Sequence, residues 1–253
     1  MILLLSPAKS LNFDEYTPEH FTTPRMLDNS EKLVAVLRKQ SAGKLKELMG
    51  VSDNIAQLNV ERYRNFQTPF TPENAKPAVL AFSGDVYTGL QAATFGPKDL
   101  AFAQQHLRIL SGLYGLLQPL DLIQAYRLEM KTKLKNGRKS NLYEFWDGQI
   151  TELLNEDLDQ SGSDVVLNLA SQEYFKAVKT KQLRGRVVNV HFKEDRDGVF
   201  KVISFNAKRA RGTMARQVVK KRILSVDDLY QLDVDGYRYE PSMSDESNLT
   251  FIK

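Results

Sequence analysis

The sequence contains no cysteine, and only three of its 253 residues are histidine. The first absence excludes disulfide bonds, thiolate metal sites and thiol-based redox chemistry. His20, His106 and His191 lie far apart and in no spacing typical of metal ligands. No pattern indicates a haem or flavin site. We therefore expect neither a metal ion nor a cofactor.

Long hydrophobic runs are also missing. The chain begins with five apolar residues, 1–5, whereas a membrane helix needs about 20 and a secretory signal begins with basic residues. These features favour a cytoplasmic protein with no membrane partner. No linker or internal repeat interrupts the chain, so we expect residues 1–253 to form a single domain.

Acidic residues are scarce in one part of the chain. Residues 176–222 contain fifteen Lys and Arg but only three acids, a net charge of +12, whereas the whole chain carries +4. Such a concentration of positive charge attracts polyanions, and nucleic acid is the first partner to consider.

Short apolar runs alternate with segments of helical periodicity. The patterns predict strands at residues 2–5, 79–82, 165–169 and 249–252, and helices at 28–40, 53–66, 97–107 and 207–223. Asp28 and Glu31 have the spacing of a capping box. Residues 187–193 and 199–205 flank an Asp-Gly turn typical of a β-hairpin. The expected fold is α/β (mixed α+β), a compact domain with a mixed sheet, helices around it and a late hairpin.

Four apolar runs end in serine, at Ser6, Ser83, Ser111 and Ser171. If the runs are parallel strands, these hydroxyls gather at the carboxyl edge of the sheet, where open α/β sheets bind ligands. Alternatively, each serine only caps a helix or turn, as Ser171 is placed to do for a helix carrying Tyr174, Phe175 and Lys176. The polar cleft predicted by the first interpretation contains Ser6, Asp85, Ser111, Arg127, Glu129, Ser171 and Glu173, with Lys9, Lys176 and Lys208 as further polar groups.

The helix predicted at residues 207–223 is amphipathic. At about 100° per residue, Arg209, Arg216 and Lys220 form a stripe nearly opposite an apolar face. The stripe is either a solvated surface or a polyanion-binding surface, and the absence of acids from residues 201–223 favours binding. The nucleic-acid-binding residues expected on this basis are Lys9, Lys176, Lys179, Lys181, Lys208, Arg209, Arg211, Arg216 and Lys220.

Gly112 and Gly115 form a candidate tight turn between apolar segments. If residues 100–110 are helical, this segment resembles a helix-hairpin-helix, in which glycines let backbone N–H groups approach a DNA phosphate. The usual motif has one residue between its glycines, whereas this one has two, and a strand at residues 108–110 is the competing prediction. A second candidate joins the basic helix through residues 224–226 to a short helix at 227–232.

Taken together, these segments resemble the peroxide stress resistance YaaA family nearly from end to end. The resemblance rests on residues 6–9 (SPAK), 84–90 (GDVYTGL), 110–115 (LSGLYG), 119–122 (PLDL), 126–130 (YRLEM), 168–171 (NLAS), 173–176 (EYFK) and 207–212 (AKRARG). It implies a cytoplasmic protein that limits peroxide damage, with lower free iron and DNA protection. It further implies a compact α/β fold with a basic cleft and a helix-hairpin-helix-like element.

Three functions remain open at this point. The first is a DNA-binding protein, not an enzyme, that protects against peroxide stress by gripping duplex or distorted DNA. The second is an enzyme that acts on a nucleotide or other phosphorylated small molecule in the polar cleft, with a carboxylate as general base. The third is iron sequestration by carboxylates. Because the chain has no cysteine, it cannot be a thiol peroxidase.

Overall fold

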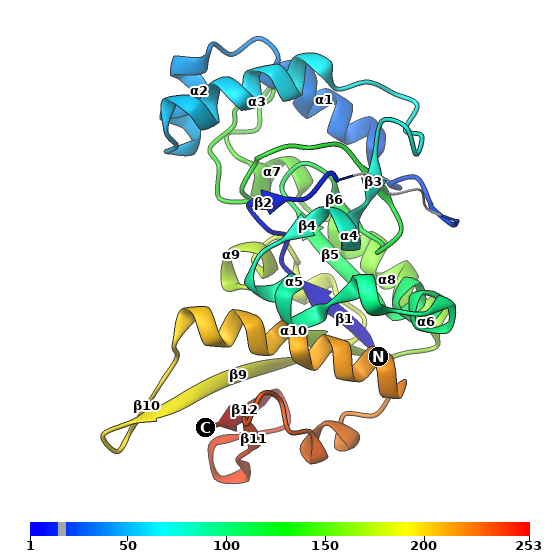
Figure 1. The fold of residues 1–253 in the computed structure, drawn as a ribbon, viewed down its shortest axis with the longest axis vertical. Coiled ribbons are helices and arrows are strands. Elements are labelled where there is room, and N and C mark those ends of the chain that lie inside the picture. The colour runs from blue at the N-terminus through cyan, green and yellow to red at the C-terminus, as the bar shows by residue number, and fades with distance from the viewer. Residues whose placement is uncertain (15–18) are drawn as a thin grey trace.

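The computed structural model describes residues 1–14 and 19–253. Within these residues the largest sheet has eight strands in the order β11–β12–β9–β8–β1–β5–β6, and β10 pairs with β9 (Figure 1). The strands are β1 (Ile2–Leu5), β5 (Leu107–Ser111), β6 (Gly115–Leu117), β8 (Val165–Asn168), β9 (Arg186–Arg196), β10 (Val199–Lys201), β11 (Arg238–Tyr239) and β12 (Asn248–Ile252).

The centre of this sheet is parallel. β1 pairs in parallel with β5 and β8, and β9 pairs in parallel with β8 and β12. All four residues of β1 are buried, as expected for apolar strands covered on both faces. β6, β10 and β11 run antiparallel to their neighbours. The sheet is therefore mixed, as predicted, and β1, β5 and β8 end at one edge.

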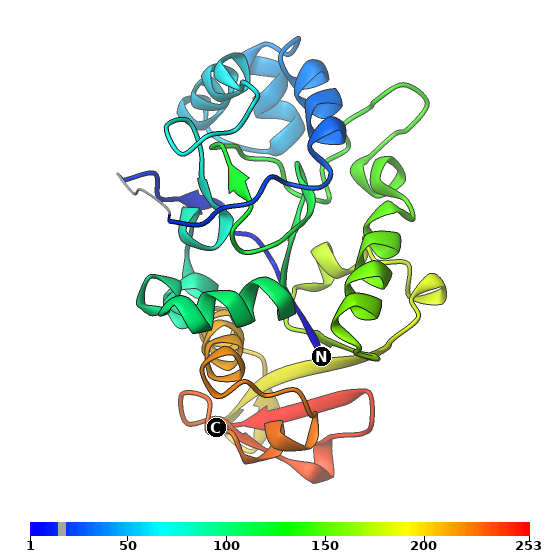
Figure 2. The same cartoon turned by 90° about the vertical axis from the view of Figure 1, so that its right-hand side faces the viewer.

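Helices cover both faces of this sheet. Figure 2 separates α5 (Asp85–Leu90), α6 (Pro97–His106) and α10 (Ser204–Lys221) on one side of β1 from α7 (Leu142–Trp146) and α8 (Gln149–Ser161) on the other. α6, α8 and α10 each contact β1. α9 (Gln172–Phe175) follows β8 directly. The arrangement is a compact α/β fold.

A further helical layer lies at one end of the molecule, at the top of Figure 1. It consists of α1 (Leu27–Leu37), α2 (Ala42–Met49) and α3 (Asp53–Asn65). Two small antiparallel ribbons connect this layer to the sheet. The remaining elements are β2 (Ser10–Leu11) with β4 (Phe82–Ser83), β3 (Lys76–Pro77) with β7 (Leu122–Ile123), α4 (Ala78–Ala81), η1 (Ala92–Thr94), η2 (Thr180–Gln182), η3 (Asp227–Gln231) and η4 (Pro241–Met243).

The strand predicted at residues 79–82 is wrong. These residues form the short helix α4 and the first residue of β4, which pairs with β2 outside the main sheet. The amides of Ala78 and Val79 donate to the carbonyl oxygens of Asp121 and Pro119, not to a neighbouring strand. A buried apolar run of four residues fits a helical turn as well as a strand, so its hydrophobicity did not distinguish the two.

Two helix boundaries also differ from the prediction. α1 ends at Leu37, its N-cap is Met26, and Glu31 accepts a hydrogen bond from Thr68 instead of completing a capping box with Asp28. α10 begins at Ser204, three residues before the predicted start. The second strand of the hairpin, β10, ends at Lys201 and does not extend to residue 205 as predicted. The predicted helices at 53–66 and 97–107, the strands at 165–169 and 249–252, and the hairpin turn itself are confirmed.

Candidate functional site

Two serines that follow neighbouring parallel strands lie in contact. Ser6 comes after β1 and Ser171 after β8, and the backbone amide of Ser171 donates a hydrogen bond to the Oγ of Ser6 (2.9 Å). The two hydroxyls are 3.3 Å apart and also hydrogen-bond. Ser171 occupies the N-cap position of α9, but its side chain does not cap that helix as predicted. The sheet edge thus brings together residues that are distant in sequence.

The other two serines are placed differently. Ser111 ends β5 at the same edge but is fully buried, where its Oγ bonds the Tyr126 hydroxyl (2.6 Å) and accepts from the amides of Leu113 and Tyr114. It therefore closes the β5–β6 turn. Ser83 reaches the edge from β4, which belongs to a separate ribbon.

A cavity of about 580 Å³, here called the strand-edge cavity, opens beside Ser6 and Ser171. Its volume lies in the range of small-molecule sites. Apolar groups of Pro7, Ala8, Val86, Leu169 and Tyr174 line part of it. Its charged lining residues are Lys9, Asp85, Glu129, Glu173, Lys208 and Arg211. The structure thus brings together most of the predicted polar cleft.

Glu129 connects several cations at the border of this cavity. Its Oε1 lies 3.2 Å from both Lys9 Nζ and Arg127 Nη2, and its Oε2 lies 3.4 Å from Lys131 Nζ. Burial favours the neutral acid, but the hydrogen bond and charge of Lys9, together with Lys131, outweigh burial and lower the pKa of Glu129. Arg127 does not line the cavity itself but pairs with this ionised carboxylate, which does.

Three other charged groups of the cavity have no such neutralisation. Among the described residues, none gives the side chain of Asp85, Lys208 or Arg211 a hydrogen bond or an ion pair. The Nε atom of Arg211 is buried without an acceptor, and burial lowers the pKa of this guanidinium. A half-buried cation without a counter-ion is costly to maintain. The cavity therefore offers an anion one open position, at Arg211, although its three cations and three acids balance overall.

A close helix crossing packs α5, which begins at Asp85, against the part of α10 that carries Lys208 and Arg211. A Cβ at Gly212 of α10 would lie 1.7 Å from the carbonyl oxygen of Val86, and one at Gly89 of α5 would lie 2.2 Å from that of Arg209. Only glycine permits this approach. The crossing fixes the N-terminal turn of α5 against the basic part of α10.

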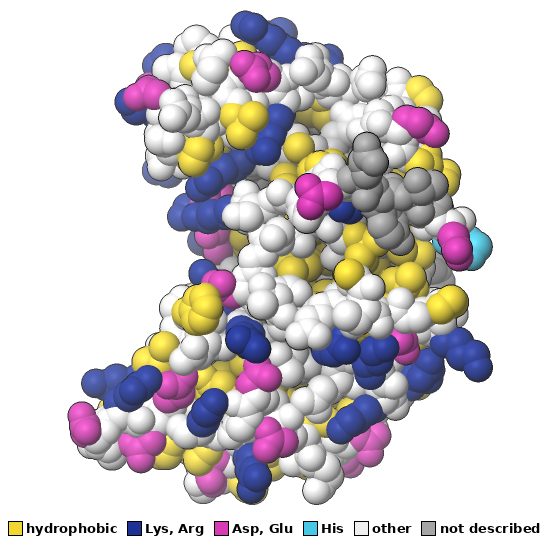
Figure 3. Space-filling view, viewed as in Figure 1, with side chains coloured by type: hydrophobic (Ala, Val, Ile, Leu, Met, Phe, Trp, Pro, Cys, Tyr) yellow, Lys and Arg dark blue, Asp and Glu magenta, His cyan; other side chains and the backbone are white. Residues whose placement is uncertain are grey.

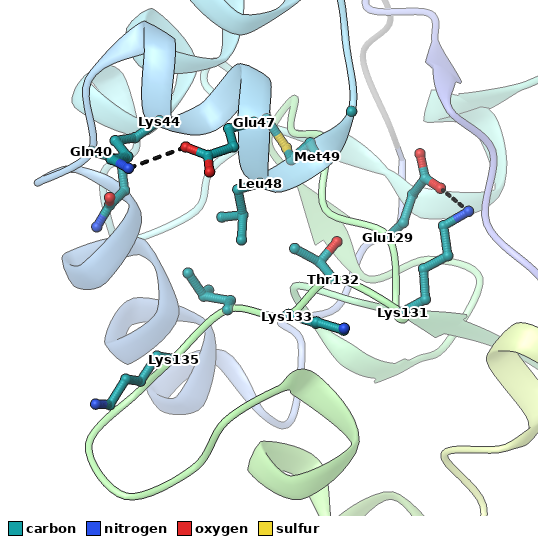
Figure 4. A pocket seen from close by; sticks show the side chains of 12 residues that line it. Gln40, Lys44, Glu47, Leu48, Met49, Glu129, Lys131, Thr132, Lys133 and Lys135 are labelled. Atoms are coloured by element: carbon teal, nitrogen blue, oxygen red, sulfur yellow. Dashed lines mark hydrogen bonds and ion pairs between the residues drawn. The ribbon is translucent and has the colours of Figure 1, made fainter.

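A second hollow, of about 790 Å³, adjoins the first at Glu129 and is here called the lysine hollow. Figure 4 shows α2 on one side and the segment 129–135 on the other. Lys44 pairs with Glu47 (3.1 Å), and Lys131 pairs with Glu129. Among the described residues, Lys133 and Lys135 have no acidic partner. Both are exposed.

The lysines of this hollow were not predicted from the sequence. Residues 131–135 read Lys-Thr-Lys-Leu-Lys, and the structure exposes the three lysines while burying Thr132 and Leu134. This alternation with a period of two is the signal of an extended, half-buried segment, and it was available in the sequence.

The helix α2, which borders the lysine hollow, is joined to α3 by only three residues. Gly50 ends α2 in the left-handed region (φ 60°), and Ser52 caps α3 by accepting from the amide of Ile55. The glycine pair selected from the sequence has a different structure. Gly112 follows β5, Gly115 begins β6, and both glycines are buried. That pair therefore joins two strands, and the helix-hairpin-helix prediction for it is wrong. The alternative at 224–226 joins α10 to the 3₁₀-helix η3.

The cations at the start of the basic region lie elsewhere. Lys176 and Lys179 border a separate hollow of about 620 Å³ with Arg138 and Lys139. Lys176 Nζ lies 5.2 Å from the Tyr143 ring centroid, and Lys179 lies 3.7 Å from Asp147. Lys181 is exposed on η2. None of the three lines the strand-edge cavity.

The predicted basic stripe of α10 is largely engaged within the protein. Arg216 donates to the carbonyl oxygens of Leu90 and Gln91 and to the Thr94 hydroxyl. Lys220 pairs with Asp99 at 2.6 Å. Arg209 lies 3.7 Å from Asp235 and remains about half exposed. The stripe is therefore not an acid-free face, because its neutralising groups come from segments distant in sequence.

Two classes of site are absent from the described residues. Within residues 1–14 and 19–253, no group of three or more His, Asp or Glu side chains is arranged to hold a metal ion. In the same part of the chain, no helix is both long and apolar enough to span a membrane.

The sheet, its charged edge and the adjoining lysine hollow define an α/β protein with two adjoining charged hollows. The chain belongs to the family described as peroxide stress protein YaaA, whose model matches residues 1–243. A UPF0246 protein of Alteromonas mediterranea is 50% identical over 254 aligned residues, which cover 100% of this chain and 98% of the relative. UPF0246 proteins of Shewanella amazonensis and Idiomarina loihiensis are each 49% identical, over 100% of this chain and 99% and 98% of the relatives.

Proposed function

We propose that this protein binds DNA along its concave face and thereby acts in protection against peroxide stress. The concave face is the left-hand side of the molecule in Figure 3, where the surface is hollowed between the α1–α3 layer and α10 and Lys and Arg side chains lie on both rims. The observation that carries the proposal is the lysine hollow: Lys133 and Lys135 are exposed beside it without an acidic partner among the described residues. Such lysines bind phosphate groups and release counter-ions from DNA.

The α2–α3 turn supplies a second kind of phosphate contact. Backbone N–H groups and the positive end of the helix dipole lie at the N-terminus of α3, directly after Gly50 and Val51. We assign the helix-hairpin-helix-like element to this turn. Because α2 also borders the lysine hollow, one DNA strand passing the hollow meets both the turn and the lysines.

Contacts of this type read the DNA backbone and little sequence. Lys9, at the border between the two hollows, extends the same grip past Glu129. DNA binding accounts for a peroxide-stress function without peroxide chemistry in the protein itself, since the chain contains no cysteine thiol.

The test is the affinity for a fluorescently labelled duplex, measured by anisotropy at low salt. The double variant Lys133→Glu/Lys135→Glu is expected to bind at least about tenfold more weakly, for all DNA sequences alike. The control, Lys98→Glu/Lys221→Glu, changes two exposed lysines that line none of the three hollows. Equal loss in both variants would indicate a net-charge effect only, and no loss in either would refute the proposal.

The strand-edge cavity favours a second candidate function, an enzyme that acts on a nucleotide or other phosphorylated small molecule. The specific observation is Asp85, which lacks a cationic partner among the described residues and is available as a general base. Turnover of a phosphorylated compound that is lost in Asp85→Asn but retained in Glu47→Gln, outside this cavity, would support it. Equal turnover by both variants would remove Asp85 from the reaction.

A further inference from the structure

One cation of the strand-edge cavity, Arg211, has no anionic partner among the described residues, and DNA binding at the lysine hollow does not explain it. The guanidinium of Arg211 is half-buried, and its Nε has no acceptor among the described residues. Arg216, five residues later on the same helix, has three oxygen partners. The difference is informative because buried charged groups are nearly always paired in folded proteins.

The neighbours of Arg211 define the charge of its ligand. Lys208 lies three residues earlier on α10, so both side chains face one direction, and both line the cavity. The fork of an arginine beside a lysine is suited to the oxygens of a single phosphate group. Among the described residues, no Asp or Glu side chain lies within ion-pair distance of Lys208 or Arg211.

The rest of the cavity defines the remainder of the ligand. Asp85 and Glu173 provide carboxylate acceptors, and Ser6 and Ser171 provide hydroxyl groups. Tyr174 lies in the lining and is partly buried, and burial raises the pKa of its hydroxyl, so the side chain remains neutral. A ligand that matches this lining has a phosphate, N–H or O–H donors and a flat, partly apolar ring.

We propose that the strand-edge cavity binds one nucleoside monophosphate, with its phosphate on Arg211 and Lys208 and its base and sugar donors on Asp85 and Glu173. The inference rests on the second candidate function, for which it names the ligand class, and its site is separate from the lysine hollow that grips DNA, although both border Glu129. The cavity volume of about 580 Å³ is larger than a lone phosphate needs and accommodates a nucleotide.

The matched variants are Arg211→Met and Arg216→Met. Both remove a guanidinium from α10 and keep a long side chain, but only Arg211 lines the cavity without a partner. Removal of the unpaired Arg211 charge is expected to leave the melting temperature of the free protein unchanged or higher. Removal of Arg216 is expected to lower it, because three hydrogen bonds are lost.

The experiment measures the binding of AMP, GMP, CMP and UMP to the full chain by calorimetry, with adenosine, ribose 5-phosphate and inorganic phosphate as comparisons. At least one nucleotide is expected to bind tenfold or more tightly than all three comparisons. Arg211→Met is expected to weaken that binding at least tenfold, whereas Arg216→Met leaves it within twofold.

Three results would overturn the inference. They are no nucleotide binding at millimolar concentration, equal affinity for inorganic phosphate and nucleotides, or equal nucleotide binding by wild type and Arg211→Met. DNA affinity is measured in parallel. Because Lys133 and Lys135 do not line the strand-edge cavity, loss of nucleotide binding with DNA affinity retained would refute this inference and leave the proposed DNA binding intact.

Discussion

Gly212 of α10 lies directly against the backbone carbonyl of Val86 in α5, so closely that a Cβ on the glycine would be 1.7 Å from the oxygen. Gly212→Ala is therefore expected to separate the two helices and to lower the free energy of unfolding by about 3 kcal/mol. The same crossing joins the two helices that supply Asp85 and Arg211 to the strand-edge cavity, so nucleotide binding should weaken as well. Urea denaturation measures the first effect and calorimetry the second.

Gly43 provides the control for this substitution. It lies in α2, where the nearest atom to an added Cβ is Ser41 Oγ at 4.0 Å. Gly43→Ala is expected to increase stability by about 0.5–1 kcal/mol, because alanine has less conformational freedom in the unfolded chain. A Gly212→Ala protein as stable as wild type would contradict the close crossing.

The sequence predicted the part of the site that follows from strand order. Ser6 and Ser171 follow β1 and β8, and parallel neighbours must end at one edge, so their contact was predictable. Ser83 reaches the same cavity from β4, outside the main sheet, and nothing in its apolar run indicated that route.

The environment of the basic helix was beyond sequence analysis. A helical wheel gives the direction of Arg216 and Lys220 but not the segment that covers them. Leu90, Thr94 and Asp99 do so, more than 100 positions earlier in the chain. In contrast, Gly50-Val51-Ser52 directly precedes the predicted helix at 53–66, but the sequence analysis did not identify it as a turn between helices and selected the pair Gly112 and Gly115. The buried strand β5 before Gly112 excludes that choice.

A buried ion cluster joins α8 to β5 of the main sheet. Asp157 is 1% exposed and accepts from Arg108 Nε (2.6 Å) and from Arg25 Nη1 (2.8 Å). Asp157→Asn leaves Arg108 buried without its counter-ion and is expected to cost about 3–5 kcal/mol in unfolding free energy. Glu47→Gln, which breaks an exposed pair with Lys44, should cost less than about 0.5 kcal/mol.

The same carboxylate makes stability depend on pH. Burial favours the neutral acid, but the hydrogen bonds and charges of Arg108 and Arg25 outweigh it and lower the pKa of Asp157 in the folded protein. Its contribution is therefore complete above the unfolded-state pKa of about 3.9 and is lost as the pH falls through the lower folded value. Stability curves of wild type and Asp157→Asn should converge in strong acid, and parallel curves would contradict this assignment.

Lys220 is expected to support structure more than DNA binding. Its Nζ lies 2.6 Å from Asp99, and its hydrogen bond to that carboxylate lowers the pKa of Asp99. In Lys220→Met the pKa of Asp99, followed by NMR titration, should rise, and the protein should lose about 1 kcal/mol or less because the pair is partly exposed. DNA affinity should stay within twofold. A tenfold loss of affinity would return Lys220 to the DNA interface.

Peroxide survival should depend on the lysine hollow. In cells that lack their own copy, the Lys133→Glu/Lys135→Glu protein is expected to restore growth after hydrogen peroxide poorly, because its grip on DNA phosphates is reversed in charge. Lys98→Glu/Lys221→Glu should restore growth like wild type at equal protein level, measured by immunoblot. Full protection by the hollow variant would separate the peroxide function from DNA binding.

The most direct test of the DNA-binding account is the salt dependence of duplex affinity. If Lys133 and Lys135 each neutralise one phosphate, replacing both with alanine should reduce the slope of log affinity against log salt by about 1.8. The Lys98→Ala/Lys221→Ala control should keep the wild-type slope. Identical slopes for the hollow variant and wild type would contradict the assignment of the concave face to DNA.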